Sequence, residues 1–272
     1  MAPGNLARDQ IVAALREAGC VFAEDEAELI LAAAGSVDKI ASMLRQRVAG
    51  VPLEVIVGWA EFCGLRLTVE PGVFVPRRRT EVVAREAVAR ARPGAVVVDL
   101  CCGTGAVAAA IHAAVDGLEL YAVDIEPAAV RCARRNLEQL GGIVLEGDLF
   151  APLPEGLIGR VDLLVVNAPY VPTDAIALMP PEAREHEPRV TLDGGADGVD
   201  VQRRVAAEAR RWLAPGGQLL VETSRDQSVR TCEAFAAGGF TAQVRRAEDI
   251  DGTVVIGAAM VASTGRATVG SD

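Results

Sequence analysis

The sequence of 272 residues shows neither the pattern of a membrane-spanning segment nor that of a secretory leader. No run of it approaches the roughly 20 uninterrupted apolar residues that a membrane span needs. Its first residues lack the basic-then-apolar order of a signal peptide. We therefore expect a soluble, cytoplasmic protein with no membrane partner.

The sequence also lacks the spacing of metal ligands and of a disulfide framework. Its six cysteines show no C-x-x-C pattern, and its only two histidines, His112 and His186, stand in unrelated segments. Zinc sites and disulfide-rich folds both depend on such spacing. We expect no metal, and we interpret the thiols as small core residues.

Positive charge is scarce, with a formal net charge of −10 and a pI of about 4.9. Tight, nonspecific binding to nucleic acid needs a positive surface that displaces counterions. The charge balance therefore disfavours a stable nucleic-acid partner, although it is still compatible with a local basic patch.

Helical periodicity dominates the first part of the chain. From about residue 6 to residue 47, apolar residues recur at helical spacing and strand-like alternation is absent. Glycine-containing breaks divide this stretch into about three short helices, and Ser36 is a candidate N-cap. Residues 1–57 are predicted to form a small helical domain, and the β-like runs around Gly64 predict a linking hairpin over residues 58–72.

After Pro93-Gly94 the pattern changes to short apolar runs that end in an acid or an amide, each followed by a helical stretch. Five such runs are Val96–Asp99, Leu120–Asp124, Ile143–Leu145, Leu163–Asn167 and Leu219–Glu222. Continuous apolar strands that alternate with helices indicate a parallel sheet covered on both faces. Two last runs, 240–245 and 253–260, predict a hairpin at the sheet edge. We expect residues 73–261 to form an α/β domain with a seven-stranded, Rossmann-like sheet, and residues 262–272 to form a disordered tail.

A glycine-rich turn, Asp99-Leu-Cys-Cys-Gly103-Thr-Gly105, follows the first of these strands and precedes a helix expected from Ala106 to Ala114. Glycine adopts positive φ and lets a ligand approach the backbone closely, and the start of the helix favours an anionic group. Asp124 ends the next strand about 20 residues further on, the distance at which an acid accepts hydrogen bonds from ribose hydroxyls. The pair predicts a nucleoside site.

Two alternatives to a mononucleoside site are a dinucleotide site and a tight turn without a ligand, because such turns are shared by several folds. The third glycine of the dinucleotide motif is absent, however, and Asp99 stands before the turn. Together with Asp124 and Gly147-Asp148-Leu149, this order resembles the motif series of class I S-adenosylmethionine methyltransferases. The resemblance implies S-adenosyl-L-methionine as the cofactor, with Asp124 on its ribose and Asp148 with Leu149 beside its adenine. The cofactor-binding residues that it implies are Phe74, Asp99, Cys101, Cys102, Gly103, Thr104, Gly105, Asp124, Ile125, Asp148, Leu149 and Asn167.

The candidate catalytic residues are Asn167, Ala168, Pro169 and Tyr170, which follow the fourth strand at the same sheet edge as the glycine turn. Methylating a planar amide or amino nitrogen is difficult because its lone pair is delocalised. An enzyme must accept both N–H protons so that the lone pair points at the methyl group, and an asparagine oxygen with a neighbouring backbone carbonyl provides two acceptors. The Tyr170 ring can lie against the flat target group. The alternative interpretation is an ordinary turn that leaves a strand.

The tetrapeptide resembles the Asn-Pro-Pro-Tyr type of signature found in amide- and amino-directed methyltransferases, with Ala168 in place of the first proline. In that family this position contributes its backbone carbonyl, which alanine retains. Pro169 still restricts Ala168 to extended conformations. The substitution removes the proline's constraint on φ, so it affects rigidity more than chemistry.

Four further segments narrow the resemblance to the glutamine N5-methyltransferases of peptide chain release factors. They are R-x-x-G-x-P at 47–52, E-F-x-G at 61–64, V-P-R followed by Thr-Glu at 75–81, and E-P with G-G-x-D-G at 187–198. The resemblance covers about residues 40 to 260. It implies transfer of a methyl group to a glutamine side-chain amide nitrogen in a protein substrate, a release factor or another glutamine-containing protein. Because residues 1–57 contain no nucleoside-type turn, we expect this helical domain to recognise that substrate.

Three departures from the family pattern lie beside the predicted cleft: Arg78-Arg79 for Pro-Glu, Cys101-Cys102 for Gly-Thr, and Ala168 for proline. They predict a relative with a different protein target. The run from Arg77 to Arg79 is either a solvated charge run or a patch that meets an acidic substrate surface. Phe74 is either a core aromatic or a wall against the methionine arm of the cofactor.

Two other functions stay open at this point. One is an amino-nitrogen methyltransferase that acts on adenine in nucleic acid or on a small molecule, and the other is a noncatalytic cofactor-binding partner protein. The negative net charge and the absence of an added recognition domain disfavour DNA as a substrate. The intact Asn-x-Pro-Tyr pattern disfavours the noncatalytic alternative.

Overall fold

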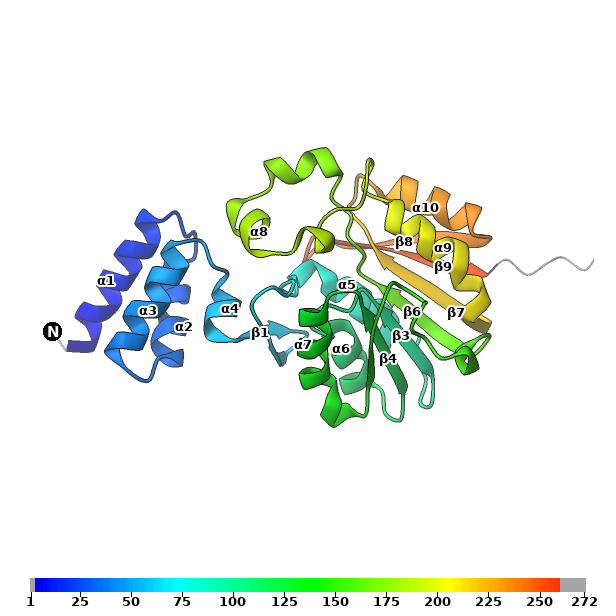
Figure 1. The fold of residues 1–272 in the computed structure, drawn as a ribbon, viewed down its shortest axis with the longest axis horizontal. Coiled ribbons are helices and arrows are strands. Elements are labelled where there is room, and N and C mark those ends of the chain that lie inside the picture. The colour runs from blue at the N-terminus through cyan, green and yellow to red at the C-terminus, as the bar shows by residue number, and fades with distance from the viewer. Residues whose placement is uncertain (1–2, 260–272) are drawn as a thin grey trace, which may run out of the picture.

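The computed structural model describes residues 3–259, which form two units side by side along the long axis of the molecule (Figure 1). A bundle of short helices stands at one end, and a sheet covered by helices forms the rest. Within the described range, every helix is too short or too polar to traverse a bilayer. The tail expected at 262–272 lies outside the described residues.

The helical unit contains α1 (Pro3–Glu17), α2 (Ala23–Ala33), α3 (Val37–Val48) and α4 (Leu53–Val57). Apolar side chains of the first three helices form its core: Ile11, Val12, Leu15, Ala23, Ala27, Ile30 and Met43. The Ser36 hydroxyl accepts a hydrogen bond from the Lys39 N–H at 3.3 Å, which confirms the predicted N-cap. Periodicity did not predict α4, because a helix of five residues is too short to show a helical repeat.

The predicted hairpin consists of the antiparallel strands β1 (Trp59–Phe62) and β2 (Leu65–Thr68). Asn136 of α7 (Pro127–Leu137) fastens it to the sheet unit: its Oδ1 accepts from the Thr68 N–H at 2.8 Å, and its Nδ2 donates to the Thr68 carbonyl at 3.0 Å. Phe62 is buried in the core of the sheet unit. The hairpin therefore packs as part of the larger unit.

The seven strands of the main sheet have the order β5-β4-β3-β6-β7-β9-β8. They are β3 (Val96–Leu100), β4 (Glu119–Asp124), β5 (Ile143–Glu146), β6 (Val161–Val166), β7 (Leu213–Glu222), β8 (Phe240–Ala247) and β9 (Gly252–Ala259). The strands from β3 to β7 are parallel, and β9 pairs antiparallel with β7 and β8. This confirms the predicted parallel sheet with a terminal hairpin. Because the chain moves outward from β3 to β5 and returns to β6 beside β3, a topological switch point lies between β3 and β6.

Helices cover both faces of this sheet. α5 (Glu81–Val88), α6 (Ala106–Ala114) and α7 pack on one face, and α9 (Asp200–Trp212) and α10 (Ser228–Ala237) pack on the other. The short helix α8 (Pro181–His186) lies between the helical unit and the sheet (Figure 1). Short 3₁₀ turns complete the chain: η1 (Arg78–Thr80), η2 (Glu138–Leu140), η3 (Glu155–Leu157), η4 (Thr173–Leu178) and η5 (Arg189–Thr191).

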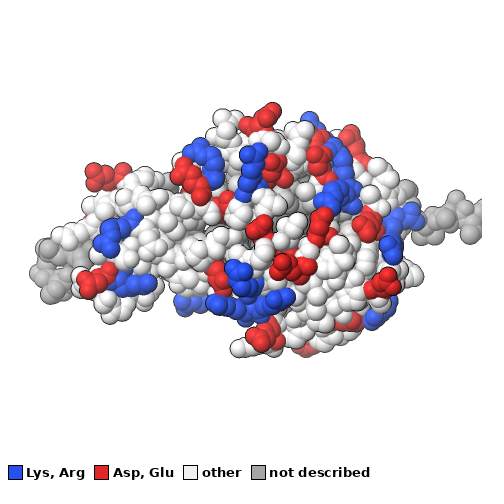
Figure 2. Space-filling view, viewed as in Figure 1, with Lys and Arg blue, Asp and Glu red and all other residues white. Residues whose placement is uncertain are grey.

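Charged side chains of both signs are interspersed over the face shown in Figure 2. Basic side chains gather over α7, where Arg131, Arg134 and Arg135 are exposed. Arg135 pairs with Glu70 at 2.9 Å. The basic patch on this face is therefore small and partly neutralised.

The cysteines differ in their surroundings. Cys102 and Cys132 are buried, three others are half-buried, and Cys63 is exposed. The prediction that the thiols are core residues is wrong for Cys63, which stands with a φ of 50° in the turn between β1 and β2.

Candidate functional site

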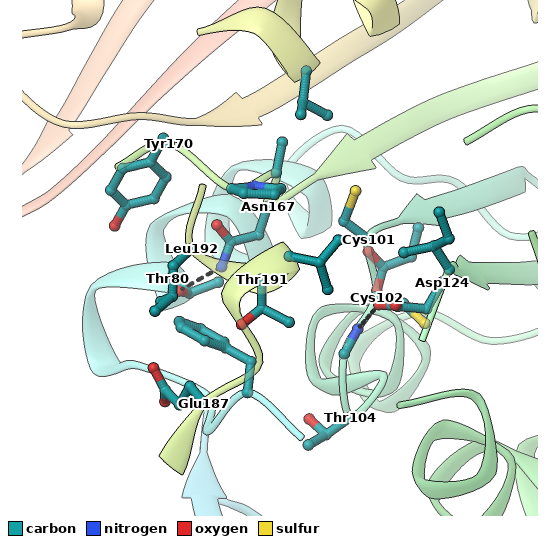
Figure 3. Close-up of a pocket in the computed structure, with 18 of the residues that line it drawn as sticks. Thr80, Cys101, Cys102, Thr104, Asp124, Asn167, Tyr170, Glu187, Thr191 and Leu192 are labelled. Atoms are coloured by element: carbon teal, nitrogen blue, oxygen red, sulfur yellow. Dashed lines mark hydrogen bonds between the residues drawn. The ribbon is translucent and has the colours of Figure 1, made fainter. Parts of the chain in front are cut away.

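A cavity of about 220 Å³ lies at the carboxyl edge of the sheet. Its walls come from the turn after β3, the ends of β4 and β5, the loop after β6 and the linker before α5 (Figure 3). All but one of the predicted site residues line it: Phe74, Asp99, Cys101, Cys102, Gly103, Thr104, Asp124, Ile125, Asp148, Leu149, Asn167, Ala168, Pro169 and Tyr170. The sheet topology thus brings the two predicted halves of the site into one space.

Gly105 is the predicted residue that does not line the cavity. It has a φ of 76°, and a Cβ on it would lie 2.9 Å from Leu137 Cδ1. The absence of a side chain lets α6 approach α7 closely. Gly105 therefore acts through helix packing, which the sequence motif does not distinguish from ligand contact.

The turn after β3 is held by hydrogen bonds to the neighbouring strand. The Cys102 N–H donates to the Val123 carbonyl at 3.1 Å, and the Gly103 N–H donates to Asp124 Oδ2 at 2.8 Å. Cys101 adopts a φ of 57°, a conformation that costs a non-glycine residue roughly 1 kcal/mol or more. The turn thus forms with a cysteine at a position for which the resemblance implies glycine.

Asp124 has two tasks. Its side chain is largely buried, and its Oδ1 accepts from the Glu126 N–H at 2.9 Å while Oδ2 accepts from Gly103. Burial raises the pKa of this carboxyl, and the two backbone N–H groups oppose the rise. Since each carboxylate oxygen has two lone pairs, Asp124 can hold the turn and still accept hydrogen bonds from ligand hydroxyls.

Asp99 lies deeper and supports the helix behind the turn. Its Oδ2 accepts from the Ala108 N–H in the first turn of α6 at 3.1 Å. Complete burial raises the pKa of Asp99 to about 7; the Ala108 N–H lowers it, and the charge of Asp124 raises it. Asp99 therefore titrates near neutral pH in the folded protein.

The predicted adenine side of the cavity contains Ile125, Asp148 and Leu149. Leu149 is buried with a φ of 49°, while the Ile125 side chain is exposed beside it. Asp148 pairs with Arg204 of α9, 2.6 Å from it, and Arg204 also lines the cavity. Arg204 carries no signal in the sequence, because it looks like any other exposed arginine on an amphipathic helix.

Phe74 forms a wall of the cavity and is only half-buried, which favours the wall interpretation over the core one. The Arg77 guanidinium carbon lies 5.0 Å from the centroid of its ring. Arg77 also pairs with Glu187, whose side chain is 1% exposed. Burial raises the pKa of Glu187, and Arg77 opposes the rise.

Asn167 stands at the end of β6 with its amide at the cavity (Figure 3). Its Nδ2 donates to the Thr80 hydroxyl at 3.3 Å. Ala168 is buried next to it, and the Tyr170 hydroxyl donates to Glu222 Oε1 at the end of β7, at 3.3 Å. Burial raises the pKa of Tyr170 well above its usual range, so the phenol stays protonated.

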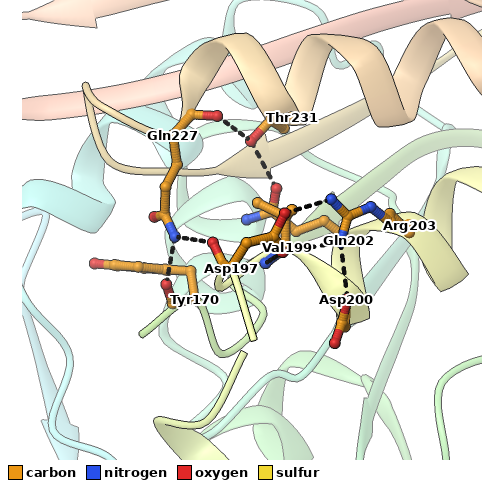
Figure 4. A network of polar contacts seen from close by, with 8 residues as sticks. All are labelled: Tyr170, Asp197, Val199, Asp200, Gln202, Arg203, Gln227 and Thr231. Carbon is orange, nitrogen blue, oxygen red and sulfur yellow. Dashed lines mark hydrogen bonds and ion pairs between the residues drawn. The ribbon is translucent and has the colours of Figure 1, made fainter. Parts of the chain in front are cut away.

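Hydrogen bonds from Gln227 and from the 194–198 segment hold the loop after Asn167 in place (Figure 4). Gln227 Nε2 donates to the Tyr170 carbonyl at 2.7 Å and to the Asp197 carbonyl at 3.2 Å. The Gly194 N–H donates to the Val171 carbonyl at 2.8 Å, and a Cβ on Gly198 would lie 2.4 Å from the Tyr170 carbonyl oxygen. These contacts constrain the loop at Tyr170 and Val171, just after Ala168. They also explain Gly198; a Cβ on Gly194 would lie 2.6 Å from the Gly198 carbonyl oxygen.

Two of the three arginines from Arg77 to Arg79 meet buried acids, which neither interpretation of the run predicted. Arg77 pairs with Glu187, and Arg79 Nε lies 3.6 Å from Glu222 Oε1; both carboxylates are buried. Arg78 and Arg79 are nevertheless exposed, so the patch interpretation stays a prediction. The pairing was not predicted, because the sequence does not show which buried acid a surface-like arginine meets.

Comparison with known proteins places the chain among methyltransferases. The family described as "Methyltransferase small domain" matches residues 65–179. A "Release factor glutamine methyltransferase" of Geobacter sulfurreducens is 37% identical over 246 residues, which cover 83% of this chain and 86% of that protein. A "4-amino-L-phenylalanine/4-methylamino-L-phenylalanine methyltransferase" of Streptomyces pristinaespiralis is 39% identical over 203 residues, 72% of this chain and 69% of that one. The crystal structure of a methyltransferase from Pyrococcus furiosus superposes with a TM-score of 0.55 at 17% identity, covering 73% of this chain and 90% of that one, and shows the same fold.

The buried Asp99 predicts a pH-dependent difference in stability. Its pKa is about 7 in the folded protein, against about 3.9 in an unfolded chain. The folded state therefore holds a proton that the unfolded state releases, and the stability gained in this way is full below about pH 4 and is lost as the pH rises to about 7. In Asp99→Asn this contribution is absent. We expect the difference in melting temperature, variant minus parent, to rise between pH 5 and pH 7 and to level off above pH 7. A difference that stays constant across this pH range would contradict the assignment.

Proposed function

We propose, on the premise that this chain belongs to the family of release factor glutamine methyltransferases, that it methylates the side-chain amide nitrogen of a glutamine in a protein with S-adenosylmethionine. A peptide chain release factor is the substrate to test first. The observation that carries the proposal is that Asn167 lines the same cavity as Asp124 and the turn after β3. The Asn167 Nδ2 atom donates to Thr80, which leaves the Asn167 Oδ1 atom free to accept a hydrogen bond.

The residues of the cavity fit S-adenosylmethionine. Asp124 would hold the ribose hydroxyls, and Ile125 with Leu149 would flank the purine on the apolar side of the cavity. The positive φ angles at Cys101 and Gly103 expose backbone at the start of α6, where a carboxylate is favoured. When bound, this cofactor supplies an electrophilic methyl group on its sulfonium sulfur.

Asn167 would act by orientation. Its Oδ1 and the backbone carbonyl of Ala168, the second acceptor that the family pattern implies, would each accept one N–H of the target amide. With both N–H groups held, the lone pair of the nitrogen is directed out of the amide plane toward the methyl group. Asn167 is not a base, because a carboxamide takes up no proton near neutral pH. Its contribution is the fixed position of one acceptor in a closed site.

The helical unit would recognise the protein substrate. Among the described residues, those that line the cavity begin at Phe74, so α1 to α4 contribute nothing to it. The unit is nevertheless connected to the cavity rim, because Arg47 of α3 lies 3.5 Å from Glu182 of α8. A substrate that binds the helices is thereby held near the segment that leads to Glu187.

A second candidate is transfer to an amino nitrogen of a small molecule. The similarity to the Streptomyces pristinaespiralis protein favours it, since the name of that relative describes methylation of an aromatic amine. The same pair of acceptors serves both nitrogens. Intact-mass analysis separates the candidates: with S-adenosylmethionine, we expect a release factor to gain one methyl group that peptide mapping places on glutamine. Modification of 4-amino-L-phenylalanine alone would favour the small-molecule function.

Asp124→Ala tests the cofactor assignment. Loss of a charged acceptor costs about 1.5 to 3 kcal/mol, so we expect binding of S-adenosylhomocysteine to weaken roughly 10- to 150-fold in calorimetry. Asp162→Ala is a matched control, because the Asp162 carboxylate also accepts a backbone N–H, from Val96 at 2.8 Å, but does so at the amino end of β3. Unchanged affinity in Asp124→Ala, or equal losses in both variants, would show that Asp124 does not hold the ligand.

Asn167→Ala tests the catalytic assignment. Removal of one preorganised hydrogen-bonding group typically lowers the rate by about 10²- to 10³-fold. We therefore expect the single-turnover rate to collapse while S-adenosylhomocysteine affinity changes little. Asn136→Ala is the structural control. Asn136 fastens the β1–β2 hairpin and also donates to the Thr104 carbonyl at 2.9 Å, so its loss should lower the melting temperature and reduce the rate far less than Asn167→Ala does. Near-normal methyl transfer by Asn167→Ala would overturn the assignment.

A further inference from the structure

The carboxamide of Asn167 has a donor end and an acceptor end of similar shape, and only one of them suits an N–H group of the substrate. We propose that Glu222 is a positioning residue that fixes this choice through the Thr80 hydroxyl. In this arrangement the Asn167 NH₂ group faces Thr80 and the Oδ1 atom faces the acceptor nitrogen. The inference rests on the proposed function and deepens it.

Glu222 is a buried carboxylate behind Asn167. It ends β7, and its side chain is 2% exposed. The Tyr170 hydroxyl donates to Oε1 at 3.3 Å, and Arg79 Nε lies 3.6 Å from the same atom. The Oε2 atom is buried and makes no hydrogen bond of normal geometry to any described residue. A side-chain hydrogen bond from Thr80 lowers the pKa of the carboxyl, so we assign the Thr80 hydroxyl as the donor to this oxygen.

The direction of the hydrogen bonds that link Glu222, Thr80 and Asn167 follows from the number of protons that each group can donate. A carboxylate only accepts hydrogen bonds, and a hydroxyl has a single proton to donate. If Thr80 donates to Glu222, its oxygen must accept from Asn167, and only the NH₂ end of the amide can donate. The opposite orientation of Asn167 would use the Thr80 proton and leave a buried, charged oxygen unpaired, which is the costlier arrangement.

This arrangement requires Glu222 to be ionised. Burial raises its pKa, whereas Thr80, Arg79 and Tyr170 lower it. Arg79 comes from η1 and Tyr170 from the loop after β6, while β9 places Val254 opposite Glu222. Tyr170 stays neutral, so within residues 3–259 Arg79 is the cation that faces this carboxylate. The arginine that departs from the family pattern therefore opposes the rise that burial causes in the Glu222 pKa.

Glu222→Gln tests the inference because glutamine keeps the size but can donate to Thr80. The Thr80 proton is then free to point at Asn167, and the orientation of the Asn167 amide is no longer determined. We expect the single-turnover rate with the protein substrate to fall roughly 10- to 100-fold. KM for that substrate and calorimetric affinity for S-adenosylhomocysteine should change by less than about threefold.

Thr80 variants test the same link, because Thr80 lies between Glu222 and Asn167 in it. Thr80→Val keeps the shape but removes the hydroxyl, so we expect a rate loss similar to that of Glu222→Gln. Thr80→Ser keeps the hydroxyl and should restore most of the rate. The double variant Thr80→Val/Glu222→Gln should be no slower than the worse single variant, because both break one chain of hydrogen bonds.

Glu119→Gln provides the matched control. The Glu119 carboxylate also accepts from a tyrosine hydroxyl, that of Tyr121 at 2.9 Å, and pairs with Arg160 at 2.9 Å, but it lies at the amino end of β4. The single-turnover rate of Glu119→Gln should equal that of the parent. A full rate in both Glu222→Gln and Thr80→Val would overturn the inference, and so would a parallel loss of S-adenosylhomocysteine binding, which would indicate a structural role.

A second readout does not require methyl transfer. Hydrogen exchange of the Asn167 side-chain NH₂, assigned by its absence from the spectrum of Asn167→Ala, should be slow in the parent and faster in Glu222→Gln and Thr80→Val. If the parent methylates no glutamine, the proposed function fails while this measurement still decides the inference. Equal exchange in the parent and both variants would refute the polarity assigned to Thr80.

Discussion

The parallel pairing of β6 with β3 is the constraint on which the rest of the structure depends. Val97 to Leu100 lie in register with Leu163 to Val166, so the turn after β3 and the loop after β6 leave the sheet side by side. Without this pairing, the turn after β3, which Asp124 holds, and Asn167 after β6 would lie on separate surfaces. The carboxyl ends of parallel strands form one edge, and the return of the chain to β6 opens a cavity there.

Asp99, Asp124 and Glu187 line this cavity, Glu222 lies behind Asn167, and each of these buried carboxylates has different partners. Within residues 3–259, Asp99 receives one backbone N–H and titrates near neutral pH, whereas Asp124 accepts two backbone N–H groups. Glu187 and Glu222 lie on the acceptor side and face Arg77 and Arg79. Burying a carboxylate is costly unless it is paired. Pairing with the two arginines offsets part of the cost of burying Glu187 and Glu222.

Much of the fold and the center of the site could be predicted from the sequence. Apolar runs ending in Asp99, Asp124 and Asn167 indicated both the strands and the edge where the functional groups gather. The partners of these groups could not be predicted, because they depend on side chains that meet only after folding. Gln227 behind Tyr170 is an example, since nothing in its local sequence distinguishes it from a surface glutamine.

A crystal structure of the protein with S-adenosylhomocysteine tests most directly that this edge holds the cofactor and the target nitrogen together. We expect the ribose hydroxyls within hydrogen-bonding distance of Asp124, and the sulfur atom directed toward Asn167. We also expect the Gly103 N–H to remain bonded to Asp124. A ligand bound outside the cavity, or one with its sulfur turned away from Asn167, would contradict the arrangement.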